Sequence, residues 1–476
     1  MSLVEYFKLK ENNTTPSKEI LAGVTTFLAM AYILAVNPDI LAATGMPKDG
    51  LFIATALASF VGTCFMAVFA NYPFALAPGM GLNAYFAFTV VLGMGYSWHF
   101  ALLAVFVEGI IFLILSLTNV REAIFNSIPL PLKTAVSVGI GLFIAFIAMQ
   151  GAHIIVDNPA TLVGFQTFNA SNINNHGICA ILALIGVGVT AFMMQKKVTG
   201  AILYGILITW ILGIIAELVG LYVVSPDTGC FSLIPKLNFS TFISAWRNFI
   251  GIFCALFTPD SWTLIKGSGE EREIISKGWP LVKSFNFVVI MFSFMFVDVF
   301  DTLGTLIGVS TKAGMLDKEG KLPRIKGALL SDSLATMLGA IFGTSTVTTF
   351  VESASGVAAG GRTGLASVVT GLLFLLSILF APIFLAIPAF ATAPALIIVG
   401  FYMMSCVINI DFDDYLNAIP CYIAILAMPF AYSISEGICL GVISWTILNF
   451  FSSRRKEISP LMYVLTILFL AKYVVL

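Results

Sequence analysis

The stretch Thr344-Ser-Thr-Val-Thr-Thr-Phe-Val-Glu-Ser-Ala-Ser-Gly356 interrupts an apolar region of the chain, and its pattern decides how the chain can fold. Its Thr, Val and Phe residues have a period of two and lead into small residues, which predicts a short extended segment followed by a half-helix. The stretch Pro73-Phe-Ala-Leu-Ala-Pro-Gly-Met-Gly-Leu-Asn-Ala-Tyr85 is a second interruption of this kind. There Pro78 disfavours helix at Ala77, while two glycines allow the backbone to approach a ligand closely.

The composition around these breaks is that of a membrane protein. Of the 476 residues, 59% are hydrophobic and only 10% are charged, and the mean hydropathy is +1.00. A water-soluble domain carries about 25% charged residues, so we expect an all-α polytopic membrane protein. The net charge of -1 argues against nucleic acid as a partner. The 7 Cys residues are scattered and show no metal-ligand spacing, so no metal and no cofactor are expected.

Apolar runs separated by polar punctuation form two sets of seven, with a long interval between them. We interpret them as membrane spans at 20–36, 51–70, 79–95, 99–117, 133–150, 177–193, 199–222, 284–310, 326–342, 347–361, 364–387, 394–409, 416–432 and 435–451. Within the interval, residues 241–258 carry Arg247 in mid-run and are expected to form an amphipathic helix at the membrane surface. The run 459–476 fits either a further span or a surface helix.

Basic residues set the predicted orientation of these spans. They follow the fourth, sixth, eighth, tenth and fourteenth runs, whereas 151–176 and 388–393 contain no Lys or Arg. Because basic loops stay in the cytoplasm, the amino terminus is predicted to be cytoplasmic. The expected location is the cell membrane (inner or plasma membrane), crossed many times.

A weak internal repeat relates the two sets of spans. Ala104–Ile114 in the fourth run resembles Ala366–Leu376 in the eleventh, although any two helices rich in Leu, Ile and Phe share some likeness. Each span crosses the membrane once, so corresponding spans that are seven apart, an odd number, run in opposite directions. One repeat is therefore inverted relative to the other. This divides the chain into repeats at 1–222 and 284–476, joined by 223–283. Inverted repeats indicate a secondary transporter with its site at the repeat interface.

Carboxylic acids inside the apolar runs are the second indication of a site. An Asp at the centre of a membrane helix costs about 2.5–3.5 kcal/mol, so such residues are expected to be functional. Asp298 and Asp301 share one helix face, and Asp332 and Glu352 come from nearby spans. Such a cluster suits a reversible proton carrier, and buried carboxyls satisfied by Thr and backbone are the alternative. Glu108 lacks polar neighbours in sequence and is interpreted as structural.

The residues at the two breaks favour an uncharged ligand. Asn, Thr and Ser side chains with several carboxyls, and no Lys or Arg within the spans, suit a neutral planar molecule rich in N–H donors and carbonyl acceptors. The half-helix after each break is expected to offer free backbone N–H groups to such a ligand. Ordinary packing of small residues is the alternative explanation of both breaks.

Four stretches of the chain closely resemble the AzgA-like purine permeases of the nucleobase–cation symporter (nucleobase–ascorbate transporter) superfamily. They are Thr25–Pro38, Ala77–Tyr85, Phe300–Thr305 and Gly343–Gly364. The resemblance implies fourteen helices, with a core domain from spans 1–4 and 8–11 and a gate domain from spans 5–7 and 12–14. It implies short antiparallel strands in spans three and ten. It also implies proton-coupled uptake of adenine, guanine or hypoxanthine by alternating access, in a homodimer.

The same resemblance assigns roles to individual residues. It implies that Asn83, Asp298 and Glu352 hold the purine and that Asp301 and Asp332 take part in proton coupling. Together with other residues at the two breaks, the candidate substrate-binding set is Gly79, Asn83, Asp298, Phe350, Glu352 and Ser353. The 223–283 segment is longer than the family pattern leads us to expect.

Other functions fit the same architecture and are kept as alternatives. An anion carrier or channel for sulfate or bicarbonate would want a cation near the helix ends, where this chain has Glu352. Sodium coupling is an alternative to proton coupling, because carboxylates and Thr hydroxyls also coordinate Na⁺. Uracil or xanthine are alternative substrates. No catalytic constellation indicates an enzyme.

Overall fold

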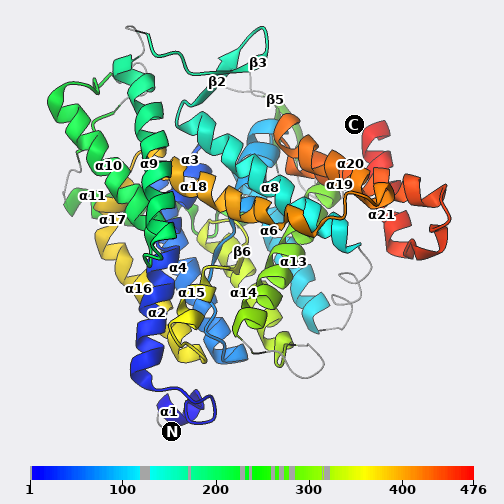
Figure 1. Ribbon diagram of the computed structural model, residues 1–476, viewed down its shortest axis with the longest axis horizontal. Helices are drawn as coiled ribbons and strands as arrows, with labels where there is room; N and C mark the ends of the chain where they lie inside the picture. The colour runs from blue at the N-terminus through cyan, green and yellow to red at the C-terminus, as the bar shows by residue number, and fades with distance from the viewer. Residues whose placement is uncertain are drawn as a thin grey trace.

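The computed structural model describes residues 3–117, 129–169, 173–225, 231–234, 239–258, 263–266, 273–277, 285–313, 315 and 322–475. Figure 1 shows a largely helical molecule in which short strands lie among the helices.

Helices of the first half follow the predicted apolar runs, and their ends carry recognisable signals. Helix α2 begins at Pro16, where proline is tolerated, and the Thr15 side chain caps it. Helix α10 ends at Gly220, whose φ of 80° suits glycine. The helices are α1 (Leu3–Tyr6), α2 (Pro16–Met30), α3 (Ile33–Ala42), α4 (Lys48–Phe65), η1 (Met66–Ala70), α5 (Met80–Ala84), η2 (Tyr85–Gly93), α6 (Trp98–Leu117), α8 (Leu130–Gly151), η3 (Ile173–Gly177), α9 (Ile178–Gln195) and α10 (Ala201–Val219).

Helices of the second half follow the same pattern after the connecting segment. Within that segment, α11 (Phe239–Ile252) occupies the region where an amphipathic helix is expected at 241–258. Beyond it lie η5 (Ala255–Phe257), α13 (Phe285–Ala313), α14 (Ile325–Phe342), α15 (Ser353–Ala358), α16 (Gly364–Ser377), η7 (Ile378–Phe380), α17 (Ala381–Leu385), α18 (Ala389–Met404), η8 (Ser405–Asn409), α19 (Tyr415–Phe430), α20 (Ile434–Phe450), η9 (Arg455–Glu457) and α21 (Pro460–Val475).

Nine helices of the described residues are long and apolar enough to cross a membrane, and six further apolar helices are shorter. Each predicted run coincides with a helix of one of these two kinds, except 347–361, where a strand and the short helix α15 lie. The predicted all-α polytopic fold is therefore confirmed. The carboxyl-terminal run forms α21, one of the shorter apolar helices.

The two predicted interruptions form paired strands. Strand β1 (Leu76–Pro78) runs antiparallel to β6 (Val347–Thr349), and Leu76 lies opposite Thr349. Both strands are fully buried. Backbone N–H and C=O groups released from a helix need partners inside a membrane protein, and two broken spans that meet can satisfy each other.

Two further hairpins lie in connections where we predicted no strands. Strand β2 (Ile155–Asn158) pairs with β3 (Leu162–Phe165), and β4 (Thr263–Lys266) pairs with β5 (Glu273–Lys277). The β2–β3 hairpin projects from one end of the molecule in Figure 1. These short strands carry too few residues for an alternation pattern to stand out in sequence.

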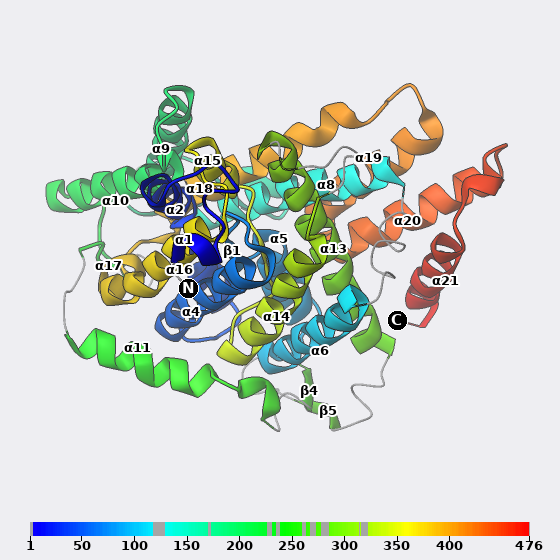
Figure 2. The same ribbon diagram turned by 90° about the horizontal axis from the view of Figure 1, so that it is seen from below.

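The helices pack in two groups, which Figure 2 shows from below. In the first group, α14 packs on α6 and α4, and α16 packs on α2 and α4, with β1 and β6 against these helices. In the second group, α8 packs on α18 and α19, while α18 also contacts α9 and α10. The paired strands lie next to the second group, because α5, directly after β1, contacts α8.

Candidate functional site

Backbone hydrogen bonds extend the pairing of the two breaks beyond the strands. The N–H of Gly79 donates to the Thr346 carbonyl at 3.0 Å, and the N–H of Phe350 donates to the Ala75 carbonyl at 3.0 Å. The Ser353 hydroxyl accepts a hydrogen bond from the N–H of Ala75 at 3.0 Å. The two broken spans are thus joined on both sides of the strands.

Two backbone N–H groups at the breaks have partners within the chain. The N–H of Gly79 is engaged by Thr346, and the N–H of Ser353 donates to the Phe350 carbonyl at 3.2 Å. These two groups are therefore not free for a ligand, because strand pairing and the following turn use them. The expectation that other N–H groups of the half-helices are offered to a ligand stays a prediction.

Asn83 lies in α5 and is fully buried. Its Oδ1 accepts a short hydrogen bond from the Ser345 hydroxyl, which comes from the segment just before β6. Its Nδ2 has a weak contact of 3.5 Å with the Pro78 carbonyl. The carbonyl end of the amide is therefore held by the second break, while the amino end is the weakly bonded one.

A single threonine connects two of the predicted acids. The Thr302 hydroxyl lies 3.3 Å from Asp298 Oδ1 and 2.9 Å from Asp332 Oδ2. It also lies 2.8 Å from the Thr348 hydroxyl of β6. All four residues are buried, and a hydroxyl carries only one hydrogen. Thr302 therefore donates to one carboxylate at a time.

Glu352 follows β6 and stands at the start of α15. The hydroxyl of Tyr32, at the junction of α2 and α3, donates to Glu352 Oε1 at 2.7 Å. Tyr32 is buried, and Glu352 is partly exposed. Phe350, two residues before Glu352, is buried in the main hydrophobic core. The Glu352 carboxylate, at the end of the second break, is therefore bonded to the first span through the Tyr32 hydroxyl.

Strand β6 brings most of the predicted residues together. Asn83 bonds to the segment before it, Asp298 and Asp332 reach it through Thr302, and Glu352 follows it. Asp301 lies in α13, but its side chain is outside the described residues. Helix α13 itself packs against β6 and α15.

Two residues of this network were not predicted, namely Tyr32 as a carboxylate partner and Ser345, whereas a Thr partner for the acids is what the alternative explanation expected. Thr302 lies four residues after Asp298, so the helical spacing was a usable signal. No local pattern relates Tyr32 to Glu352 or Ser345 to Asn83. Those pairs are 320 and 262 positions apart in the chain.

Known proteins are similar to this sequence over nearly its whole length. Residues 17–440 match the permease family. The guanine/hypoxanthine permease PbuG of Bacillus subtilis is 42% identical, over 99% of this chain and 99% of its own. The adenine permease AdeP of Escherichia coli is 38% identical, over 99% of this chain and 96% of its own.

A solved structure shares the fold at low identity. The transmembrane domain of the cyanobacterial bicarbonate transporter BicA superposes with a TM-score of 0.61 and 15% identity. The match covers 89% of this chain and 97% of that domain, and at this identity it shows the fold alone. With its apolar helices and relatives named as permeases, this chain is a multi-pass membrane transporter and not an enzyme. It belongs to the permease family.

Proposed function

We propose that this permease imports purine nucleobases together with protons. The observation that carries the proposal is the arrangement around β6, where an amide and three carboxyl groups from four spans converge on two paired breaks. Relatives named for guanine, hypoxanthine and adenine support a purine as the substrate.

The proposed substrate contacts follow from the chemistry of these groups. A purine base is uncharged and offers ring N–H donors with nitrogen and carbonyl acceptors. The amino group of Asn83 has only one weak contact among the described residues, and we assign it as a donor to the base. The carboxyl groups of Asp298 and Glu352 accept hydrogen bonds from the N–H groups of the base. Phe350 supplies an apolar surface beside them.

Proton coupling is assigned to the acids around Thr302. Two buried carboxylates that share one hydroxyl hydrogen are better satisfied when one of them carries a proton and donates it. We assign this proton to the pair Asp298 and Asp332. Asp301, on the same helix, is proposed to exchange it with the cytoplasm.

Alternating access is proposed to move the first group of helices, as a core domain, against the second group, as a gate domain. One polar contact crosses between them, from Thr392 to Asp39, and Asp39 is itself paired with Lys48 inside the first group. Lys48 Nζ lies 2.5 Å from Asp39 Oδ1 and donates to the Ile387 carbonyl at 3.3 Å. Thr392 of α18 donates to Asp39 Oδ2 at 3.3 Å. Relative movement of the two groups would break the contact between Thr392 and Asp39.

The proposed location is the cell membrane with a cytoplasmic amino terminus, supported by the distribution of Lys and Arg. Reporter fusions after residues 196 and 388 test it, since the first is expected inside and the second outside. A homodimer is proposed from the family resemblance and is tested by the mass of the detergent-solubilised protein.

Uptake of radiolabelled base by a host that lacks its own purine permeases tests the function. We expect accumulation of guanine, hypoxanthine or adenine as unmodified base, abolished when the pH gradient is collapsed at constant sodium. Loss of uptake on removal of sodium alone would show sodium coupling. Uptake of sulfate or bicarbonate without any purine would reject the proposal in favour of an anion carrier.

A further inference from the structure

Asn37 is a fully buried amide that lies outside the proposed substrate contacts. It belongs to α3, in the first span. Its Nδ2 donates to the Thr55 hydroxyl of α4 at 2.7 Å and to the Thr344 hydroxyl at 3.0 Å. Thr344 stands immediately before Ser345, so this amide reaches the entrance to the second break from 307 positions away in the chain.

The orientation of the Asn37 amide is determined by its neighbour. The single hydrogen of the Thr55 hydroxyl is donated to the Leu51 carbonyl at 2.6 Å, so Thr55 can only accept from Asn37. The amino group of Asn37 must therefore face the two threonines. Its Oδ1 has no hydrogen-bond partner among the described residues, so both of its hydrogen bonds there are donated.

A short chain of contacts leads from Asn37 to the proposed substrate amide. Asn37 holds Thr344, and the next residue, Ser345, donates to Asn83 Oδ1. The residue after that, Thr346, accepts a backbone hydrogen bond from Gly79. A shift of the 344–346 segment would therefore move both the Ser345 hydroxyl and the backbone contact that begins the first half-helix.

We propose that Asn37 is a positioning residue, which holds the 344–346 segment so that Ser345 orients the Asn83 amide toward the purine. A buried amide with an unmatched oxygen costs stability, so simple packing would be served better by an apolar side chain. This inference rests on the proposed function, because the affinity it controls is that for a purine base.

Equilibrium binding of radiolabelled guanine, adenine and hypoxanthine to the purified protein, each in turn, tests the proposal. The base that wild type binds most tightly is then used for the variants. Asn37→Leu removes both donated hydrogen bonds at similar volume, and Thr344→Val removes only the contact to the break. Each is expected to raise the Kd for that base about ten-fold, the effect of about 1.4 kcal/mol. Thr55→Val keeps the contact to Thr344 and is the matched control, with a Kd expected to stay within about two-fold of wild type.

A second pair of variants separates positioning from loss of folding. Ser345→Ala is expected to raise the Kd about as much as Asn37→Leu, and the double variant to add little, because both act through one contact. Elution of each variant as a single folded species in detergent is the check on integrity. Unchanged purine affinity in Asn37→Leu, an equal loss in Thr55→Val, or additive losses in the double variant would overturn the inference. Failure of wild type to bind any of the three purines would instead reject the proposed function.

Discussion

The hydroxyl of Tyr32 donates a hydrogen bond of 2.7 Å to Glu352, across 320 positions of the chain. This contact ties the junction of two helices in the first span to the end of the second break. It gives one oxygen of the Glu352 carboxylate a partner from the first span.

Replacement of Tyr32 by Phe should weaken purine binding. The variant keeps the ring and loses one hydrogen bond to a carboxylate, worth about 1.5 kcal/mol or roughly a ten-fold increase in Kd. Glu352→Gln should raise the Kd at least as much. Tyr222→Phe is the matched control, since the Tyr222 hydroxyl donates to the Phe231 carbonyl away from the site. Equal Kd values for Tyr32→Phe and wild type would show that this contact does not shape the site.

Loss of the Thr302 hydroxyl should alter the pH dependence of transport. Thr302→Val leaves Asp298 and Asp332 without their shared donor, and we expect the initial uptake rate to fall roughly ten-fold. Thr302→Ser keeps the hydroxyl and should retain most of the activity. Uptake measured between about pH 5.5 and about 8 distinguishes a loss of proton coupling, which changes the pH profile, from structural damage. A rate that falls equally at every pH would indicate structural damage and not proton coupling.

Gly356 is required by close packing of α15 on the first span. A Cβ at this position would lie 2.0 Å from the Thr26 hydroxyl and 2.7 Å from the Ala22 carbonyl. Gly356→Ala should therefore destabilise the protein by about 1–3 kcal/mol and reduce uptake. Gly188→Ala is the control, since its Cβ would meet no atom within 4 Å. Melting temperatures in detergent measure the stability of both variants. Equal melting temperatures for Gly356→Ala and Gly188→Ala would contradict the packing argument.

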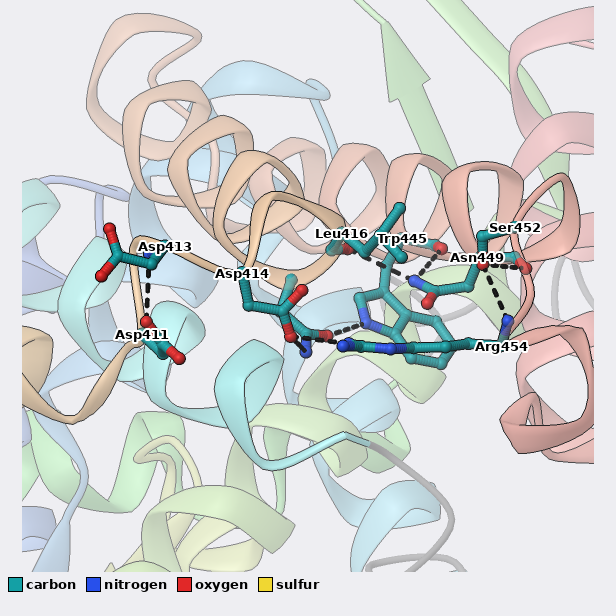
Figure 3. Close-up of polar contacts among 9 residues, drawn as sticks. Asp411, Asp413, Asp414, Leu416, Trp445, Asn449, Ser452 and Arg454 are labelled. Atoms are coloured by element: carbon teal, nitrogen blue, oxygen red, sulfur yellow. Dashed lines mark hydrogen bonds and ion pairs between the residues drawn. The ribbon is translucent and has the colours of Figure 1, made fainter.

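The ion pair between Asp414 and Arg454 joins the start of α19 to the segment after α20, as Figure 3 shows. Arg454 Nη1 lies 2.6 Å from Asp414 Oδ2, and this hydrogen bond lowers the pKa of Asp414 below its ordinary value. A carboxyl with a lowered pKa in the folded state stabilises the fold above its unfolded pKa of about 3.9. That contribution is lost as the pH falls through the folded value.

Arg454→Gln should therefore lower the melting temperature at pH 7 and have a smaller effect near pH 3.5. Both side chains are partly exposed, so the contribution is at most about 1 kcal/mol. Lys456→Gln removes an equal charge from the same segment and serves as the control. A melting difference between wild type and Arg454→Gln that grows as the pH falls would contradict the assignment.

Individual residues show where prediction from sequence succeeds. Pro78 and the alternating Thr and Val residues of 346–349 act on their own backbone, so both breaks were predicted within a few residues of β1 and β6. Asp298, Asp332 and Glu352 were identified because any acid within an apolar run is costly. The partner of the Gly79 N–H, the Thr346 carbonyl, could not be predicted, because it lies in the other half of the chain.

The order of apolar runs, the two breaks and the acids within the spans were determined by the sequence alone, because hydropathy, proline geometry and buried charge act locally. The pairing of β1 with β6, the bond from Tyr32 to Glu352 and the hydroxyl shared by Asp298 and Asp332 were decided only by tertiary structure. The two strands, and the pair Tyr32 and Glu352, meet only when distant parts of the chain pack together. Thr302 reaches Asp332 only when α13 and α14 come together in the fold, since sequence spacing relates Thr302 to Asp298 alone.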